Sequence, residues 1–258
     1  MNSILKISDL TIGYKTSKSP IIVADNINME LEKGKLTALV GANGIGKSTL
    51  LKTILGFEKA FKGSILLNNK NISEISSKEL AQYVSAVLTE KLPPSNLSVY
   101  ELVTLGRQPY TNWIGELSDS DKEKTNEAIE LTQIRPFIHK KHFELSDGQL
   151  QKVMIARALA QDTEIMILDE PTTHLDLLHK ISVFKLLKKL VLQTQKCVLF
   201  STHDIDLAIE FCDEIIVMTS EKTQKDTPEN LIKNGTFDKL FSSESVWFDK
   251  EKRKFVFD

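Results

Sequence analysis

The sequence predicts an α/β fold: a parallel sheet with helices, preceded by an antiparallel β segment and interrupted by a helical insert. Helix-period stretches alternate with short apolar runs, at 36–40, 84–88, 165–168, 198–200 and 215–218. This order is typical of parallel strands joined by helices. The first 30 residues alternate apolar and polar side chains, which indicates short antiparallel strands. Between residues 90 and 150, prolines and glycines separate helical patterns at 99–105 and 122–131, which favours an inserted helical segment.

The composition is that of an ordinary globular chain and narrows the class of protein. The 258 residues include 33 Lys and Arg against 35 Asp and Glu, for a net charge of −2. Such a balance gives no support for nucleic-acid binding through bulk positive charge, so we expect no nucleic-acid partner. The longest stretch without a charged residue is Leu36–Gly46, whereas a membrane span needs roughly 20 apolar residues. The N-terminus lacks a signal-peptide pattern, so we expect neither a span nor an export signal.

The two cysteines indicate a reducing compartment. Cys197 and Cys212 each lie in an apolar stretch and form no CxxC pair. We expect both to be buried free thiols, which suits a cytoplasmic protein.

A phosphate-binding motif occupies the segment from Gly41 to Ser48. Its sequence, GANGIGKS, matches GxxxxGK[ST], and it follows an expected strand and opens an expected helix. Backbone N–H groups would form an anion cradle, with Lys47 at the β- and γ-phosphates and the Ser48 hydroxyl at Mg²⁺. A Gly-rich turn with a surface lysine is the structural alternative, which eight matching positions make less favoured. We therefore predict a nucleotide site that contains Gly41, Asn43, Gly44, Gly46, Lys47, Ser48 and Thr49.

A pair of carboxylates follows one of the apolar runs. Residues 165–168 lead directly into Asp169 and Glu170, at the strand end where α/β sheets bind ligands. Together with the phosphate loop, this places Asp169 in the Mg²⁺ shell and makes Glu170 the general base that activates water. The pair alone is a weak signal, because hydrophobic strands often end in acids.

A third motif, LSDGQ, spans Leu145–Gln149 and precedes an amphipathic helix pattern over 150–160. Ser146 is an N-cap by residue type, and Gly148 allows close backbone approach. Taken alone, these five residues favour an ordinary helix cap.

The order of these motifs resembles that of the nucleotide-binding subunits of the ATP-binding cassette (ABC) family, over about residues 4 to 220. The family's order is phosphate loop, LSxGQ signature, hydrophobic strand with Asp-Glu, then a histidine. The resemblance implies a P-loop NTPase, RecA-like core that uses ATP and Mg²⁺. It also implies a homodimer in which each ATP lies between the phosphate loop of one copy and the signature of the other. Ser146, Gly148 and Gln149 would then complete the site of the second copy.

Three further positions match functional residues of that family. Tyr14 would stack on adenine, His203 would contact the γ-phosphate, and Asp176 would contact the opposite subunit. The structural alternatives are packing for Tyr14 and an ordinary strand-end role for His203. For Asp176 the alternative is an N-cap, which is compatible with the interface role.

Two positions depart from the family pattern. Asp147 stands where glycine is commonest, and we expect its side chain to point outward because a first-turn acid suits the helix dipole. The family's Mg²⁺-sensing glutamine is replaced by Thr89, followed by Glu90. Either the Thr89 hydroxyl ligates the metal, or Glu90 reaches it after a small register change.

The domain organisation expected from these motifs is a single ABC ATPase domain over 1–258. Its nucleotide-binding core and β subdomain would comprise 1–90 and 150–220. The helical insert, 91–149, would end in the signature, and the tail, 221–258, has no assigned role.

The resemblance also implies a transport function. The stretch LGRQP within 102–110 resembles the LGRxP stretch of the ATPase subunits of importers for iron–siderophore complexes, haem or cobalamin. It lies in the insert, which in the family contacts the membrane partner. We therefore expect polytopic permease subunits and, indirectly, a substrate-binding protein as partners of an ATPase at the cytoplasmic face of the cell membrane. The alternatives are a cassette ATPase without a transport role, such as one of iron–sulfur assembly, and an ABC subunit for another substrate. A small GTPase is disfavoured because Asn69–Ile72 lacks the aspartate of the guanine-reading NKxD.

Overall fold

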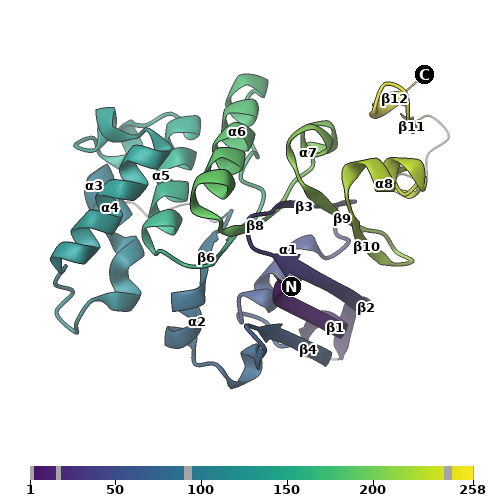
Figure 1. Cartoon of the computed structure of the whole chain (residues 1–258), viewed down its shortest axis with the longest axis horizontal. Coiled ribbons are helices and arrows are strands. Elements are labelled where there is room, and N and C mark those ends of the chain that lie inside the picture. The colour runs from purple at the N-terminus through teal and green to yellow at the C-terminus, as the bar shows by residue number, and fades with distance from the viewer. Residues whose placement is uncertain (1–2, 16–18, 90–94, 241–245, 258) are drawn as a thin grey trace.

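A six-stranded sheet forms the centre of the computed structural model, which describes residues 3–15, 19–89, 95–240 and 246–257 (Figure 1). The strand order is β10-β9-β3-β8-β7-β6. The strands are β3 (Leu36–Gly41), β6 (Val84–Val87), β7 (Ile165–Leu168), β8 (Cys197–Ser201), β9 (Glu214–Met218) and β10 (Thr223–Asp226). All neighbours pair in parallel except β9 and β10, which are antiparallel. The predicted α/β class is confirmed.

Apolar layers cover both faces of this sheet, because successive residues of a strand point to opposite sides. In β8, Val198 and Phe200 pack with the helices α5 (Asp147–Ala160), α6 (Leu177–Thr194) and α7 (Ile205–Phe211). Cys197 and Leu199 face the other layer, which contains α1 (Lys47–Ile54) and the N-terminal strands. Coverage on both faces explains why the sequence shows continuous apolar runs here.

The N-terminal strands form the predicted antiparallel sheet, in the order β2-β1-β4-β5. They are β1 (Ser3–Lys15), β2 (Pro20–Glu32), β4 (Lys62–Leu67) and β5 (Lys70–Asn71). The first two have 13 residues each and are longer than the short strands that the sequence indicates. Asp9 and Asn26 adopt φ values of 48° and 50° beside shifts in register. These left-handed residues accommodate the shifts in register, so each strand continues past them.

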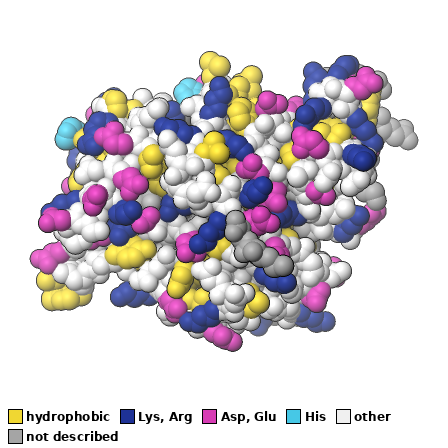
Figure 2. Space-filling model, in the orientation of Figure 1, with side chains coloured by type: hydrophobic (Ala, Val, Ile, Leu, Met, Phe, Trp, Pro, Cys, Tyr) yellow, Lys and Arg dark blue, Asp and Glu magenta, His cyan; other side chains and the backbone are white. Residues whose placement is uncertain are grey.

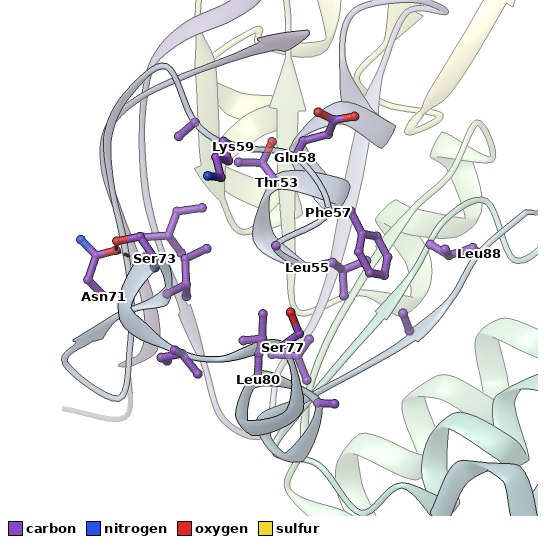
Figure 3. Close-up of a pocket in the computed structure, with 18 of the residues that line it drawn as sticks. Thr53, Leu55, Phe57, Glu58, Lys59, Asn71, Ser73, Ser77, Leu80 and Leu88 are labelled. Atoms are coloured by element: carbon purple, nitrogen blue, oxygen red, sulfur yellow. Dashed lines mark hydrogen bonds between the residues drawn. The ribbon is translucent and has the colours of Figure 1, made fainter. Parts of the chain in front are cut away.

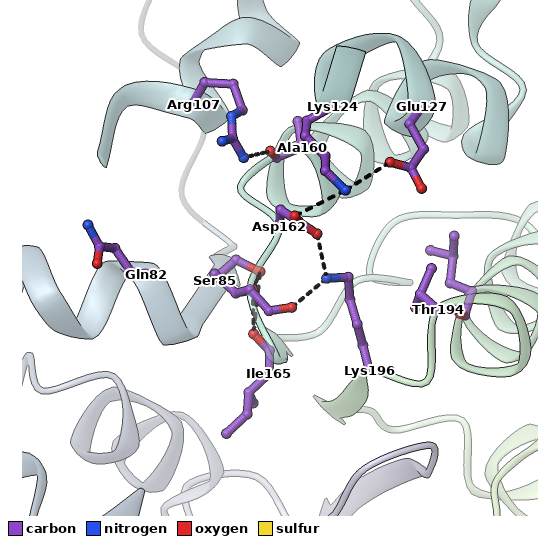
Figure 4. Close-up of polar contacts among 12 residues, drawn as sticks. Gln82, Ser85, Arg107, Lys124, Glu127, Ala160, Asp162, Ile165, Thr194 and Lys196 are labelled. Atoms are coloured by element: carbon purple, nitrogen blue, oxygen red, sulfur yellow. Dashed lines mark hydrogen bonds and ion pairs between the residues drawn. The ribbon is translucent and has the colours of Figure 1, made fainter. Parts of the chain in front are cut away.

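The helical insert contains α3 (Val99–Thr104), the 3₁₀ segment η2 (Leu105–Tyr110) and α4 (Asp119–Thr132). Polar contacts fix it to the core (Figure 4). Arg107 is buried and donates to Asp121 Oδ1 at 2.9 Å and to the Ala160 carbonyl at 2.7 Å. Lys124 of α4 and Lys196 before β8 each lie 3.2 Å from Asp162. Helix α5 packs against α3 and α4, so the expected boundary at residue 150 falls within a helix that the insert and the core share.

The remaining helices flank the sheets. Helix α2 (Ser77–Tyr83) leads into β6, and α8 (Pro228–Lys233) follows β10. The tail, which the sequence left unassigned, ends in the hairpin of β11 (Val246–Asp249) and β12 (Lys254–Phe257). Phe237 and Phe248 stack with ring centroids 5.0 Å apart and belong to the same apolar cluster as α7. The tail is therefore packed onto the core.

The two cysteines are buried as expected, and the surface carries charges of both signs (Figure 2). Both cysteines are buried and free, and burial raises the pKa of Cys197 to about 12. On the face shown in Figure 2, basic and acidic side chains are intermixed. Among the residues described, no helix combines the length and the apolar character that a membrane span requires.

Candidate functional site

The phosphate loop connects the end of β3 to the start of α1, at the C-terminal edge of the central sheet. Gly44 and Gly46 have φ values of 77° and 110°, a region that favours glycine. A Cβ at Gly46 would lie 2.4 Å from Cγ1 of Val23 on β2. The loop is therefore packed closely against the β subdomain, which excludes a side chain at this position.

Lys47 turns back over this loop. It is 5% exposed, and Nζ donates to the carbonyls of Gly41 at 2.9 Å and Ala42 at 3.2 Å. Burial lowers its pKa, and the negative charges of Glu170 and Asp169 partly oppose that shift. Neutral carbonyls thus hold a buried ammonium group at the loop.

Asp169 lies just beyond β7 and contacts the loop from across the sheet edge. Its Oδ1 accepts hydrogen bonds from Ser48 Oγ at 3.1 Å and from Ser201 Oγ at 2.6 Å. Ser201 is fully buried at the end of β8, and its Oγ also accepts the Glu170 N–H at 2.8 Å. One serine hydroxyl therefore positions both consecutive acids. We did not predict this role, although a polar residue at the end of an apolar strand was a visible signal.

Glu170 and His203 form a direct pair. His203 Nε2 lies 2.9 Å from Glu170 Oε1, and Thr173 Oγ1 donates to Oε2 at 3.0 Å. Glu170 has a φ of 49°, a left-handed conformation that costs about 1–2 kcal/mol for a residue with a side chain. The backbone bond to Ser201 stabilises this turn, which directs the carboxylate toward the histidine.

Asp204 fixes the loop that carries His203. Its Oδ2 accepts from Thr172 Oγ1 at 2.8 Å, and its Oδ1 accepts from Lys180 Nζ of α6 at 2.6 Å. This network was also missed, because sequence spacing does not show that Thr172 and Lys180 meet a residue after β8.

The LSDGQ segment caps α5 in the way that its residue types predict. Ser146 Oγ accepts the Gln149 N–H at 3.3 Å, and Gln149 Oε1 accepts the Ser146 N–H at 3.2 Å. These reciprocal bonds form a capping box. Asp147 is exposed, whereas Gly148 is buried. A Cβ at Gly148 would lie 2.4 Å from Cδ2 of the His179 ring.

Asp176 is the N-cap of α6. Its carboxylate accepts the His179 N–H at 2.9 Å and lies 2.8 Å from His179 Nδ1. These hydrogen bonds, that of the backbone first, lower the pKa of Asp176. His179 thus connects Asp176 to the LSDGQ segment.

Two predicted site residues, Tyr14 and Thr89, are exposed and lie at the ends of strands β1 and β6. Tyr14 lies near the end of β1 and is 46% exposed. It is on the same face of the strand as Ile12. Ile12 lies against the phosphate loop, because its Cδ1 would be 3.8 Å from a Cβ at Gly46. Thr89 is exposed just after β6, and Glu90 lies outside the described residues. The functional roles of Tyr14 and Thr89 remain predictions.

The predicted residues therefore form two clusters. One contains the phosphate loop with Lys47 and Ser48, together with Asp169, Glu170 and His203. The other contains Ser146, Gly148, Gln149 and Asp176, joined through His179.

Comparisons with known proteins bear on the family of the chain. The family model for ABC transporters matches residues 24–173. An uncharacterised ABC transporter ATP-binding protein of Methanocaldococcus jannaschii is 39% identical over 92% of this chain and 81% of its own length. The iron(3+)-hydroxamate import ATP-binding protein of Bacillus subtilis is 38% identical over 84% of this chain and 79% of its own. The dimeric structure of an ATP-binding cassette bound to ADP and Pi superimposes with a TM-score of 0.74 at 28% identity, covering 87% of this chain and 98% of that one.

Proposed function

The chain belongs to the ABC transporter family, and from this premise we propose that it hydrolyses ATP to power an importer. The observation that carries the proposal is the first cluster, where Ser48, Asp169 and the Glu170–His203 pair meet behind a phosphate loop. Lys47 and the loop N–H groups hold the phosphates in this proposal, and Glu170 takes a proton from the attacking water. His203 keeps the Glu170 carboxylate in place and contacts the γ-phosphate.

The residues present fit Mg²⁺. Ser48 Oγ and Asp169 Oδ1 lie 3.1 Å apart, and both are oxygen atoms, the type of ligand that this ion prefers. When bound, the ion neutralises phosphate charge. Thr89 is proposed as a further ligand, because it follows β6 at the same sheet edge.

We propose a homodimer with two composite sites. Each chain carries a phosphate-loop cluster and a separate Ser146–Gly148–Gln149–Asp176 cluster at a helix N-terminus, which favours an anion. Two copies arranged head to tail complete each other's sites. The dimeric cassette among the solved relatives supports this arrangement.

A hollow of about 820 Å³, lined by residues at and after the end of α1 and by residues of α2, β6 and α5, is the proposed dock for the membrane permease (Figure 3). Leu55, Phe57 and Leu88 surround it, and Arg157 of α5 lines it. Phe57 is 63% exposed. Burial lowers the pKa of Arg157, which forms no ion pair within the described part of the chain. An apolar segment that carries a carboxylate would complement this hollow in both shape and charge.

The proposed cargo is a ferric siderophore, and the proposed location is the cytoplasmic face of the membrane. The hydroxamate-import relative supports this substrate class. Within 102–110, Gly106 and Arg107 are buried, and Arg107 bonds to Asp121 and to the Ala160 carbonyl. This stretch therefore holds the insert in place and does not contact the cargo. Substrate recognition would belong to the permease and to a substrate-binding protein.

Co-purification tests the transport assignment. The chain is expressed with a candidate permease, extracted in detergent and isolated through a tag on the permease. We expect the chain in the eluate, with an ATPase activity that the Lys47→Ala variant lacks. Recovery with soluble partners alone would support the non-transport alternative.

A further inference from the structure

One histidine, His179, lies between the two parts of the second cluster. On one side, its Nδ1 lies 2.8 Å from Asp176 Oδ2, while its own N–H donates to Oδ1 at 2.9 Å. On the other side, a Cβ at Gly148 would lie 2.4 Å from Cδ2, 3.0 Å from Cγ and 3.2 Å from Nε2. The imidazole therefore fills the space that a side chain at position 148 would need.

The same turn of α6 also reaches the first cluster. Lys180, the next residue, donates to Asp204 at 2.6 Å, and Asp204 directly follows His203. A displacement of this turn would therefore affect both the signature segment and the loop of the histidine that holds Glu170.

We propose that His179 is a positioning residue that sets the signature segment relative to Asp176, so that both reach the nucleotide of the second copy together. This inference rests on the proposed composite-site dimer. The ring is 48% exposed and needs no contact with the nucleotide. It acts through two fixed neighbours, an ionised cap on one side and a glycine on the other.

ATP-driven dimerisation tests the inference in the full-length chain. The Glu170→Gln background keeps ATP intact, and sedimentation gives the ATP concentration at half-maximal dimer. We expect His179→Ala to raise that concentration about five- to tenfold, the effect of losing one hydrogen bond. Binding of a fluorescent ATP analogue to the dilute monomer should not change, because the phosphate loop is untouched.

Matched variants separate positioning from general damage. His179→Asn keeps a donor for Asp176 and should recover most of the loss. His139→Ala removes another exposed histidine, in the insert, and should behave as the background does. Equal dimerisation of the His179→Ala and background proteins would overturn the inference. Absence of any ATP-dependent dimer in the background itself would overturn the proposed function, and this inference with it.

A second measurement does not depend on dimerisation. Gly148→Ala should lower the thermal midpoint in the presence of His179, and His179→Ala should relieve that loss because it removes the clash. If Gly148→Ala has the same effect with and without His179, the two residues are not coupled and the inference fails.

Discussion

Ser201→Ala removes the hydroxyl that positions both acids of the first cluster. The change leaves the partly buried Glu170 N–H without its acceptor and Asp169 without its 2.6 Å donor. An unsatisfied buried group costs about 1–3 kcal/mol, and a hydrogen bond to a charged group contributes about 1.5–3 kcal/mol. These effects overlap at one site, so we expect the free energy of unfolding to fall by about 3 kcal/mol. Loss of a residue that orients a metal ligand should also raise the Mg²⁺ requirement about 10- to 100-fold.

Urea denaturation and a Mg²⁺ titration of ATPase activity measure the two effects separately. Ser85→Ala is the matched control, because Ser85 is equally buried but contacts Thr163 and Ile165. Thr163 can still donate to the Ile165 carbonyl at 2.8 Å in that variant. The control should lose about 1 kcal/mol and keep its Mg²⁺ requirement. A Ser201→Ala protein with wild-type stability and Mg²⁺ requirement would contradict the positioning role of Ser201.

Three other changes probe the loop, the insert and the hollow. Lys47→Ala should abolish nucleotide binding in equilibrium dialysis with only a small change in the thermal midpoint, because the loss of two hydrogen bonds to carbonyls is partly offset by removing an ammonium group whose charge is disfavoured by burial. Retained binding would count against the phosphate cradle. Arg107→Ala should cost about 3–5 kcal/mol by leaving Asp121 buried and unpaired, whereas Lys124→Ala at an exposed pair should cost less than about 1 kcal/mol. Burial opposes the charge on Asp121, but bonds from Ser118 and Arg107 outweigh it and lower its pKa. The contribution of the Asp121 carboxylate to stability is therefore present above the pKa that it has in the unfolded chain, and it is lost as the pH falls through the lowered pKa of the folded state. Without Arg107 the folded-state pKa of Asp121 rises, so denaturation curves should show this loss of stability beginning at a higher pH. Arg157→Glu should lose co-purification with the permease while binding ATP normally, and an unchanged yield would argue against the hollow as the dock.

Motifs with local geometry could be predicted from the sequence. The phosphate loop, the apolar strand before Asp169 and the cap at Ser146 each depend on neighbouring residues, and each lies where its pattern indicates. The two faces of the sheet also follow from period-two burial in runs such as 197–200.

Contacts between distant segments could not be predicted. Ser201 meets Asp169 only because β8 pairs with β7, and Lys180 meets Asp204 only because α6 packs beside α7. The shifts in register beside Asp9 and Asn26 could not be predicted either, because they depend on how β1 pairs with β2. The tail was unassigned because Phe237 and Phe248 are too far apart in the chain to show a periodic pattern.

The Glu170→Gln variant gives the most direct test of the central claim, that two copies close around ATP and that Glu170 then activates water. Single-turnover hydrolysis and sedimentation with ATP and Mg²⁺ would be measured on the same sample. We predict a stable dimer that retains uncleaved ATP. Hydrolysis at close to the wild-type rate would contradict the assignment of the base, and a protein that stays monomeric with bound ATP would contradict the composite site.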